Sequence, residues 1–146
     1  MAKSKTSATI QIQAPVEEVF KFAATPKHTP MFVPNLAENS GFSTEETAVG
    51  QTWDWRFTML GVDLTGKAET TAVEPNKSWS LKSSGGAASE WTYTYEAAGG
   101  GTQVTVTCEY EIPAGVLKKA AAPAVEAMNA KLAVAALDNL KTILED

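Results

Sequence analysis

The spacing of hydrophobic residues divides this chain into a β-rich body and a helical C-terminal third. In residues 8–14, ATIQIQA, apolar side chains occupy every second position, which is typical of a half-buried strand. Six later segments keep the same period of two and predict six further strands: 36–46, 51–59, 62–75, 78–83, 90–97 and 101–113. The pattern therefore predicts a sheet of seven strands.

Two short helices are expected after the first strand. Residues 14–26 have apolar side chains at helical spacing, and Pro15 suits the first position of a helix. The next segment, 25–34, contains three prolines, which exclude a long helix and a central strand. It predicts a short helix that starts at Pro26 and an ordered loop that presents Met31 and Phe32.

Two tight turns fix the pairing of the strands. A turn at Leu60–Gly61 places Asp54 opposite Lys67 on one face and Trp55 opposite Gly66 on the other. Opposite charges then meet, and a glycine leaves room for an indole ring, so this register is favoured. A Gly-Gly turn at 99–100 pairs three aromatic residues with smaller partners: Tyr95 with Val104, Tyr93 with Val106, and Trp91 with Cys108.

The C-terminal third predicts one long helix. From Ala114 to Leu144 apolar residues recur at steps of three or four, at Leu117, Ala121, Val125, Met128, Leu132, Ala136, Leu140 and Ile143. Pro123 is expected to start the main part of this helix or to kink it. A sheet with one apolar face must be covered, and only this helix is long enough to cover it. The fold class is therefore α+β, with a curved antiparallel sheet around the C-terminal helix.

This order of elements resembles the helix-grip fold of the START-like (SRPBCC) superfamily. The residues that carry the resemblance are IQIQAPVEEVFKFAATP, VGQTWDW with LGVDLTGKAETTAVEP, EWTYTYEAAGGGTQVTVTCEYEIPAG, and the closing LDNLKTILE. They are similar to the polyketide cyclase/dehydrase branch of that superfamily. The resemblance covers nearly the whole chain and implies an elongated cavity between the sheet and the last helix, suited to an apolar or amphipathic ligand.

Composition and charge narrow the function classes. The 146 residues fit one domain, 1–146, with residues 1–5 as a flexible tail. A net charge of −5 argues against a nucleic-acid surface, and apolar runs are too short to span a bilayer. The N-terminus lacks the apolar region of a secretory signal, so a cytoplasmic protein is expected. The expected oligomeric state is a monomer or a homodimer, and no feature of the sequence supports the dimer.

Candidates for catalysis are few. The single histidine, His28, and the single cysteine, Cys108, exclude a histidine-based metal cage and an internal disulfide. No nucleotide, haem or metal cofactor is indicated. The weak catalytic candidates are His28, Arg56, Asp63 and Tyr93. Arg56 is expected on the outer face as a partner for Asp54 or Asp63, and only a flipped register would turn it inward to hold a ligand carboxylate.

An aromatic stripe at Trp91, Tyr93 and Tyr95 raises the central question of the sequence. The stripe either fills a dry core or lines a cavity, because buried tyrosine hydroxyls need partners that water or a ligand could supply. The candidate ligand-binding residues are Met31 and Phe32 at the mouth, and Trp55, Phe57, Trp79, Trp91, Tyr93, Tyr95, Tyr110, Met128 and Leu132 along the wall.

Three functions follow from these features. The first is binding of a small hydrophobic or aromatic molecule, lipid- or polyketide-like, in that cavity. The second is a cyclase, aromatase or dehydratase that moves protons with one or two polar groups. The third is a co-chaperone-like interaction module, which would need an exposed apolar patch.

Overall fold

The structure is a computed structural model that describes residues 3–145. It contains seven strands and four helical segments, in the order β1 (Ser4–Ile12), α1 (Val16–Ala23), η1 (Pro26–Met31), β2 (Leu36–Ser40), β3 (Thr52–Met59), β4 (Val62–Glu74), β5 (Ser78–Gly85), β6 (Ser89–Ala98), β7 (Gly101–Tyr110), α2 (Ala114–Leu117) and α3 (Ala122–Glu145). Both the α+β class and the element order predicted from the sequence are confirmed.

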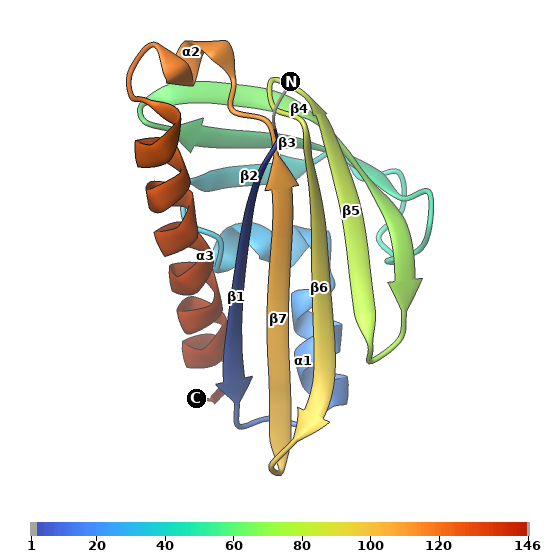
Figure 1. Ribbon diagram of the computed structural model, residues 1–146. Helices are drawn as coiled ribbons and strands as arrows, with labels where there is room; N and C mark the ends of the chain where they lie inside the picture. Colours follow the sequence, from blue (N-terminus) through green and yellow to red (C-terminus); the bar gives the residue numbers. More distant parts are fainter. Residues whose placement is uncertain (1–2, 146) are drawn as a thin grey trace.

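All seven strands form one antiparallel sheet in the order β1-β7-β6-β5-β4-β3-β2. The sheet curves into a half-barrel (Figure 1), so that β2, β3 and the first part of β4 cross near one end of β1, β7 and β6. In this view α3 runs alongside β1, and α1 lies behind β6 and β7. This is the helix-grip arrangement, with helices and curved sheet enclosing the interior.

The predicted registers are confirmed. Asp54 pairs with Lys67 and Trp55 with Gly66, while Tyr93 pairs with Val106 across the second hairpin. A Cβ atom on Gly66 would lie 1.9 Å from the Ser84 carbonyl oxygen and 2.7 Å from the Trp55 ring. Glycine is therefore required where the indole lies against the neighbouring strand.

The start of β1 and the end of β2 differ most from the sequence prediction. β1 begins at Ser4, because Ser4 and Lys5 pair with Tyr110 and Glu109 of β7, so the expected flexible tail at 1–5 is wrong for these two residues. Residues 1 and 2 of that tail lie outside the described residues. β2 ends at Ser40 and not at residue 46, since Gly41 turns the chain with a φ of 64°.

The C-terminal helix is divided as Pro123 indicated. α2 ends at Leu117, and α3 starts at Ala122, with Pro123 in its first turn. α3 buries Val125, Ala133, Ala136, Leu137 and Leu140. Within residues 3–145, no helix combines the length and the hydrophobicity needed to cross a membrane.

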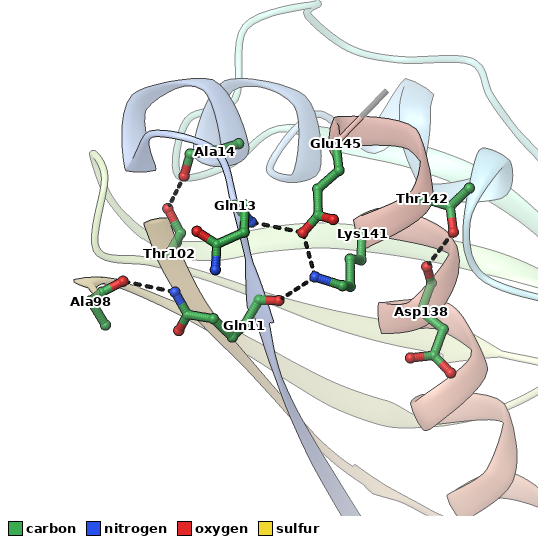
Figure 2. A network of polar contacts seen from close by, with 9 residues as sticks. All are labelled: Gln11, Gln13, Ala14, Ala98, Thr102, Asp138, Lys141, Thr142 and Glu145. Carbon is green, nitrogen blue, oxygen red and sulfur yellow. Dashed lines mark hydrogen bonds and ion pairs between the residues drawn. The ribbon is translucent and has the colours of Figure 1, made fainter. Parts of the chain in front are cut away.

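A polar network fixes the end of α3 to the sheet (Figure 2). The Lys141 ammonium donates to the Gln11 carbonyl oxygen at 3.0 Å and to the Glu145 carboxylate. The same carboxylate accepts a hydrogen bond from the Gln13 backbone N–H at 2.8 Å. These contacts join the last turn of α3 to the end of β1.

Candidate ligand-binding site

A cavity of about 150 Å³ lies inside the half-barrel. A single buried water needs roughly 10–15 Å³ on a comparable scale, so the interior is far from solidly filled. Every strand contributes to the wall, together with η1 and α3. The lining residues are Thr6, Thr29, Val33, Pro34, Leu36, Asn39, Trp53, Trp55, Phe57, Met59, Ala68, Leu81, Ser83, Ala87, Ser89, Trp91, Tyr93, Val106, Cys108, Tyr110, Glu111, Asn129, Leu132, Ala133 and Ala136.

Indole rings from β3 and β6 form much of the apolar wall. Trp53 and Trp55 alternate with polar residues along β3, so both face inward, and Trp91 does the same on β6. The Trp55 indole N–H donates to the Lys67 carbonyl oxygen at 3.0 Å, and that of Trp91 donates to the Ser89 hydroxyl at 2.9 Å. Because these N–H groups are already paired, the rings offer the cavity carbon surface and π-faces.

Six of the predicted ligand-binding residues line this cavity. They are Trp55, Phe57, Trp91, Tyr93, Tyr110 and Leu132. Their positions follow from the period of two in the strands and from the helical spacing in α3. The structure thus places the centre of the aromatic stripe on a cavity and not in a closed core.

The two residues predicted at the mouth, Met31 and Phe32, do not line the cavity. Met31, at the end of η1, is 60% exposed and does not line the cavity, whereas Phe32 is 1% exposed. Phe32 packs against Phe22 of α1 with ring centroids 6.4 Å apart. The 3₁₀ turn of η1 separates these neighbouring side chains, sending one outward and one into the core.

Trp79, Tyr95 and Met128 also fail to reach the cavity. The Trp79 indole N–H donates to the Thr70 hydroxyl at 3.1 Å within the core. Tyr95 meets the edge of Phe20 of α1 at a centroid distance of 5.3 Å. Trp79 and Tyr95 share the inner face of the sheet, but Phe20 of α1 packs on Tyr95, and the Trp53 and Tyr93 rings flank Trp79.

Three of the four catalytic candidates lie outside the cavity. Arg56 is exposed on the outer face, 3.4 Å from the Glu38 carboxylate, so the flipped register is excluded. Asp63 is exposed and accepts a hydrogen bond from the Thr58 hydroxyl at 3.0 Å. His28 stacks on Phe22 at 4.3 Å, and its Nδ1 lies 2.9 Å from the Phe22 carbonyl oxygen. Tyr93 alone lines the cavity.

The phenols of Tyr93 and Tyr110 and the thiol of Cys108 stay neutral at physiological pH. Burial raises the pKa of the Tyr93 phenol, and the nearby Cys108 raises it further. Burial also raises the pKa of the Cys108 thiol to about 12, with a smaller contribution from Glu109. Burial likewise raises the pKa of Tyr110, and the polar side chains of Asn129 and Ser4 offset part of that rise.

Polar lining residues were largely missed by the sequence analysis. Strand alternation could have found Ser83 and Ser89, which share faces with Leu81 and Trp91. Asn39 could not be found in this way, because a bulge between Leu36 and Glu38 shifts the phase of β2. Thr29 lies in the proline-rich η1, where no period assigns a face.

Several of these polar atoms have no partner. Among residues 3–145, the buried side-chain oxygens without a hydrogen bond are Thr29 Oγ1, Asn39 Oδ1, Tyr95 Oη and Tyr110 Oη. Three of the four belong to residues that line the cavity. Asn129 and Ser4 influence the pKa of Tyr110 without forming a hydrogen bond of good geometry to its hydroxyl. The cavity wall is thus mostly carbon, with a few unsatisfied polar groups.

The fold and the cavity agree with one protein family. The model of the family described as polyketide cyclase/dehydrase and lipid transport matches residues 3–145. The chain therefore belongs to this family. No match was found among curated protein sequences.

Several solved structures share the fold. A protein from Thermus thermophilus is 21% identical, with a TM-score of 0.77 and 96% of each chain covered. The Zhui aromatase/cyclase from Streptomyces sp. R1128 is 13% identical, with a TM-score of 0.76 over 99% of this chain and 94% of that one. The major latex-like protein 151 from Panax ginseng is 17% identical, with a TM-score of 0.71 and 99% of each chain covered. At such identities these likenesses establish the fold alone.

Proposed function

We propose that this protein binds a small hydrophobic or aromatic molecule, lipid- or polyketide-like in character, in the cavity between the sheet and α3. The observation that carries the proposal is the unfilled space of about 150 Å³ walled by tryptophan, phenylalanine and aliphatic side chains. Moving apolar ligand surface from water into such a space is favourable, and the few polar groups of the wall would orient the ligand.

The family assignment supports this proposal, since the family description includes lipid transport as well as polyketide cyclisation. A cyclase or dehydratase is the weaker candidate. Such an enzyme needs a group that gains or loses a proton near neutral pH. Tyr93 and Cys108 are poor groups for this task because burial raises the pKa of each. Arg56, Asp63 and His28 do not line the cavity, and Glu111 is the one carboxylate among the described residues that does.

A co-chaperone-like module is supported less well. The exposed large apolar side chains among the described residues are Met31, Val49, Leu60, Leu117 and Val134. They lie on η1, a loop, the β3–β4 turn, α2 and α3, and not along one element. Single exposed apolar residues are normal on protein surfaces.

The test is binding of naphthalene, a neutral apolar probe, followed through the tryptophan indole N–H signals of ¹⁵N-labelled protein. We expect the signals of Trp53, Trp55 and Trp91 to shift, because these rings line the cavity. The Trp79 signal should shift less, because its ring is enclosed in the core. Unchanged signals up to the solubility limit of naphthalene would contradict the proposal.

A matched pair of variants locates the binding. Ala133→Leu places a larger side chain on the cavity wall, whereas Ala127→Leu adds the same atoms on the exposed side of α3. We expect the first to weaken naphthalene binding about tenfold, or about 1.4 kcal/mol, and the second to leave it unchanged. Equal effects of the two variants would show that the probe binds elsewhere.

A further inference from the structure

The unpaired oxygens around the cavity define the chemistry of its ligand, and this inference rests on the proposed binding function. We propose that the cavity selects a neutral aromatic molecule that bears hydroxyl groups, and that it rejects carboxylates such as fatty acids. Thr29, Asn39 and Tyr110 are the residues that determine this specificity.

Two hydroxyl groups on the cavity wall are buried without a partner. Thr29 is 8% exposed and Tyr110 is 6% exposed, yet neither hydroxyl has a hydrogen-bond partner. An unpaired buried hydroxyl destabilises a protein, so native structures rarely retain one without a reason. Both residues line the cavity, so a ligand hydroxyl inside it can pair with them.

The Asn39 amide sets the direction of one hydrogen bond to the ligand. Its side-chain nitrogen donates to the Pro26 carbonyl oxygen at 2.8 Å. A carbonyl oxygen can only accept, so this contact fixes the amide and leaves Asn39 Oδ1 as a free acceptor. The ligand must therefore supply a donor here. A hydroxyl or phenol does so, whereas a carboxylate does not.

The unpaired groups lie on two separate parts of the wall. Thr29 and Asn39 come from η1 and β2, whereas Tyr110 ends β7. Four strands separate β2 from β7 in the sheet order. The aromatic residues of β3 and β6 lie on the intervening part of the sheet. This arrangement fits a flat apolar body with a polar group at each end.

The charge of the wall disfavours an anionic ligand. Among residues 3–145, no lysine, arginine or histidine lines the cavity, and Glu111 is the one charged residue that does. A buried carboxylate needs a cation or several donors to offset its loss of hydration. Here it would meet no cation, and only the Thr29 and Tyr110 hydroxyls could donate to it, while Asn39 Oδ1 and the Glu111 side chain oppose it, so the cavity should reject it.

The test compares four probes of similar shape: naphthalene, 2-naphthol, 2-naphthoate and 2-naphthylmethylammonium. Binding of each is followed through the indole N–H signals of Trp53, Trp55 and Trp91. We expect 2-naphthol to bind about tenfold more tightly than naphthalene, since one buried hydroxyl gains its partner. We expect no saturable binding of 2-naphthoate. The cationic probe should bind more weakly than 2-naphthol.

Isosteric variants then test the named residues. Thr29→Val and Tyr110→Phe remove one hydroxyl each, and we expect the affinity ratio of 2-naphthol to naphthalene to fall toward one in at least one of them. Tyr95→Phe is the matched control, because the Tyr95 hydroxyl is also buried and unpaired but does not line the cavity. Its ratio should equal that of the wild-type protein.

The outcomes separate this inference from the function on which it rests. If neither naphthalene nor 2-naphthol binds, the proposed binding function is overturned. If naphthalene binds as tightly as 2-naphthol, if 2-naphthoate binds saturably, or if the cationic probe binds more tightly than 2-naphthol, this inference alone is overturned. The inference would also be overturned if the affinity ratio of 2-naphthol to naphthalene fell as much in Tyr95→Phe as in Thr29→Val or Tyr110→Phe.

Discussion

Buried hydroxyl groups in this protein fall into two kinds. Thr102 and Thr70 are paired: the Thr102 hydroxyl donates to the Ala14 carbonyl oxygen at 2.8 Å, and the Thr70 hydroxyl donates to Gln51 at 3.1 Å. Those of Thr29 and Tyr110, on the cavity, are unpaired. The paired hydroxyls stabilise the fold. The unpaired hydroxyls lower its stability, and a hydrogen bond to a ligand can offset this loss.

This difference predicts that a Thr→Val substitution changes the free energy of unfolding differently at Thr102 and at Thr29. Thr102→Val leaves the Ala14 carbonyl without its partner and should lower the free energy of unfolding by about 1–3 kcal/mol. Thr29→Val removes a hydroxyl that has no partner, so stability should stay equal or rise by up to about 1 kcal/mol. Urea unfolding of the two variants and the wild-type protein measures both. A clear loss of stability in Thr29→Val would mean that its hydroxyl is paired.

At the scale of elements, the period of hydrophobic residues predicted the strands and their registers well. Paired charges and the small residue opposite Trp55 fixed the β3–β4 hairpin, and both glycine-containing turns lie where they were expected. Local pattern was sufficient here because side-chain alternation and turn geometry are local properties.

The division of the inner face between core and cavity could not be predicted in this way. Trp79 and Tyr95 follow the same alternation as Trp91 and Tyr93, but only the latter pair lines the cavity. The difference comes from sheet curvature, from the bulge between Thr70 and Ala72, and from the packing of α1 against β6. These features depend on residues far apart in the chain, so the spacing of hydrophobic residues within one strand does not predict them.

The contact between α3 and β1 predicts a pH dependence. Hydrogen bonds from Lys141 and from the Gln13 backbone lower the pKa of Glu145 below its ordinary value. A lowered folded-state pKa stabilises the fold above the unfolded value, about 4.3 for glutamate, and this stabilisation is lost as the pH falls through the folded value. The stability difference between wild-type protein and Glu145→Gln should therefore be present at neutral pH and shrink in acid.

Thermal unfolding at a series of pH values measures this difference. Lys141→Gln provides the comparison, because the Lys141 hydrogen bond is the largest cause of the lowered pKa of Glu145. This variant should lose part of the same acid dependence. An acid dependence identical in Lys141→Gln and the wild-type protein would contradict the role given to the contact.

At the scale of the whole molecule, the single cysteine reports how tightly the interior is closed. Cys108 is buried on β7, and burial raises the pKa of its thiol to about 12, so almost no thiolate exists at neutral pH. We expect Ellman's reagent to react with Cys108 slowly in the native protein and rapidly in urea. Fast stoichiometric reaction without denaturant would show that the half-barrel opens readily.

The central claim is that the half-barrel encloses a binding cavity, and nuclear Overhauser effects between a bound probe and the protein test it most directly. With 2-naphthol bound, we predict contacts from its ring protons to the Ala133 methyl group and to the Trp91 indole, which line the cavity from the helix and from the sheet. Contacts only to exposed apolar side chains such as Met31 and Val134 would contradict the claim.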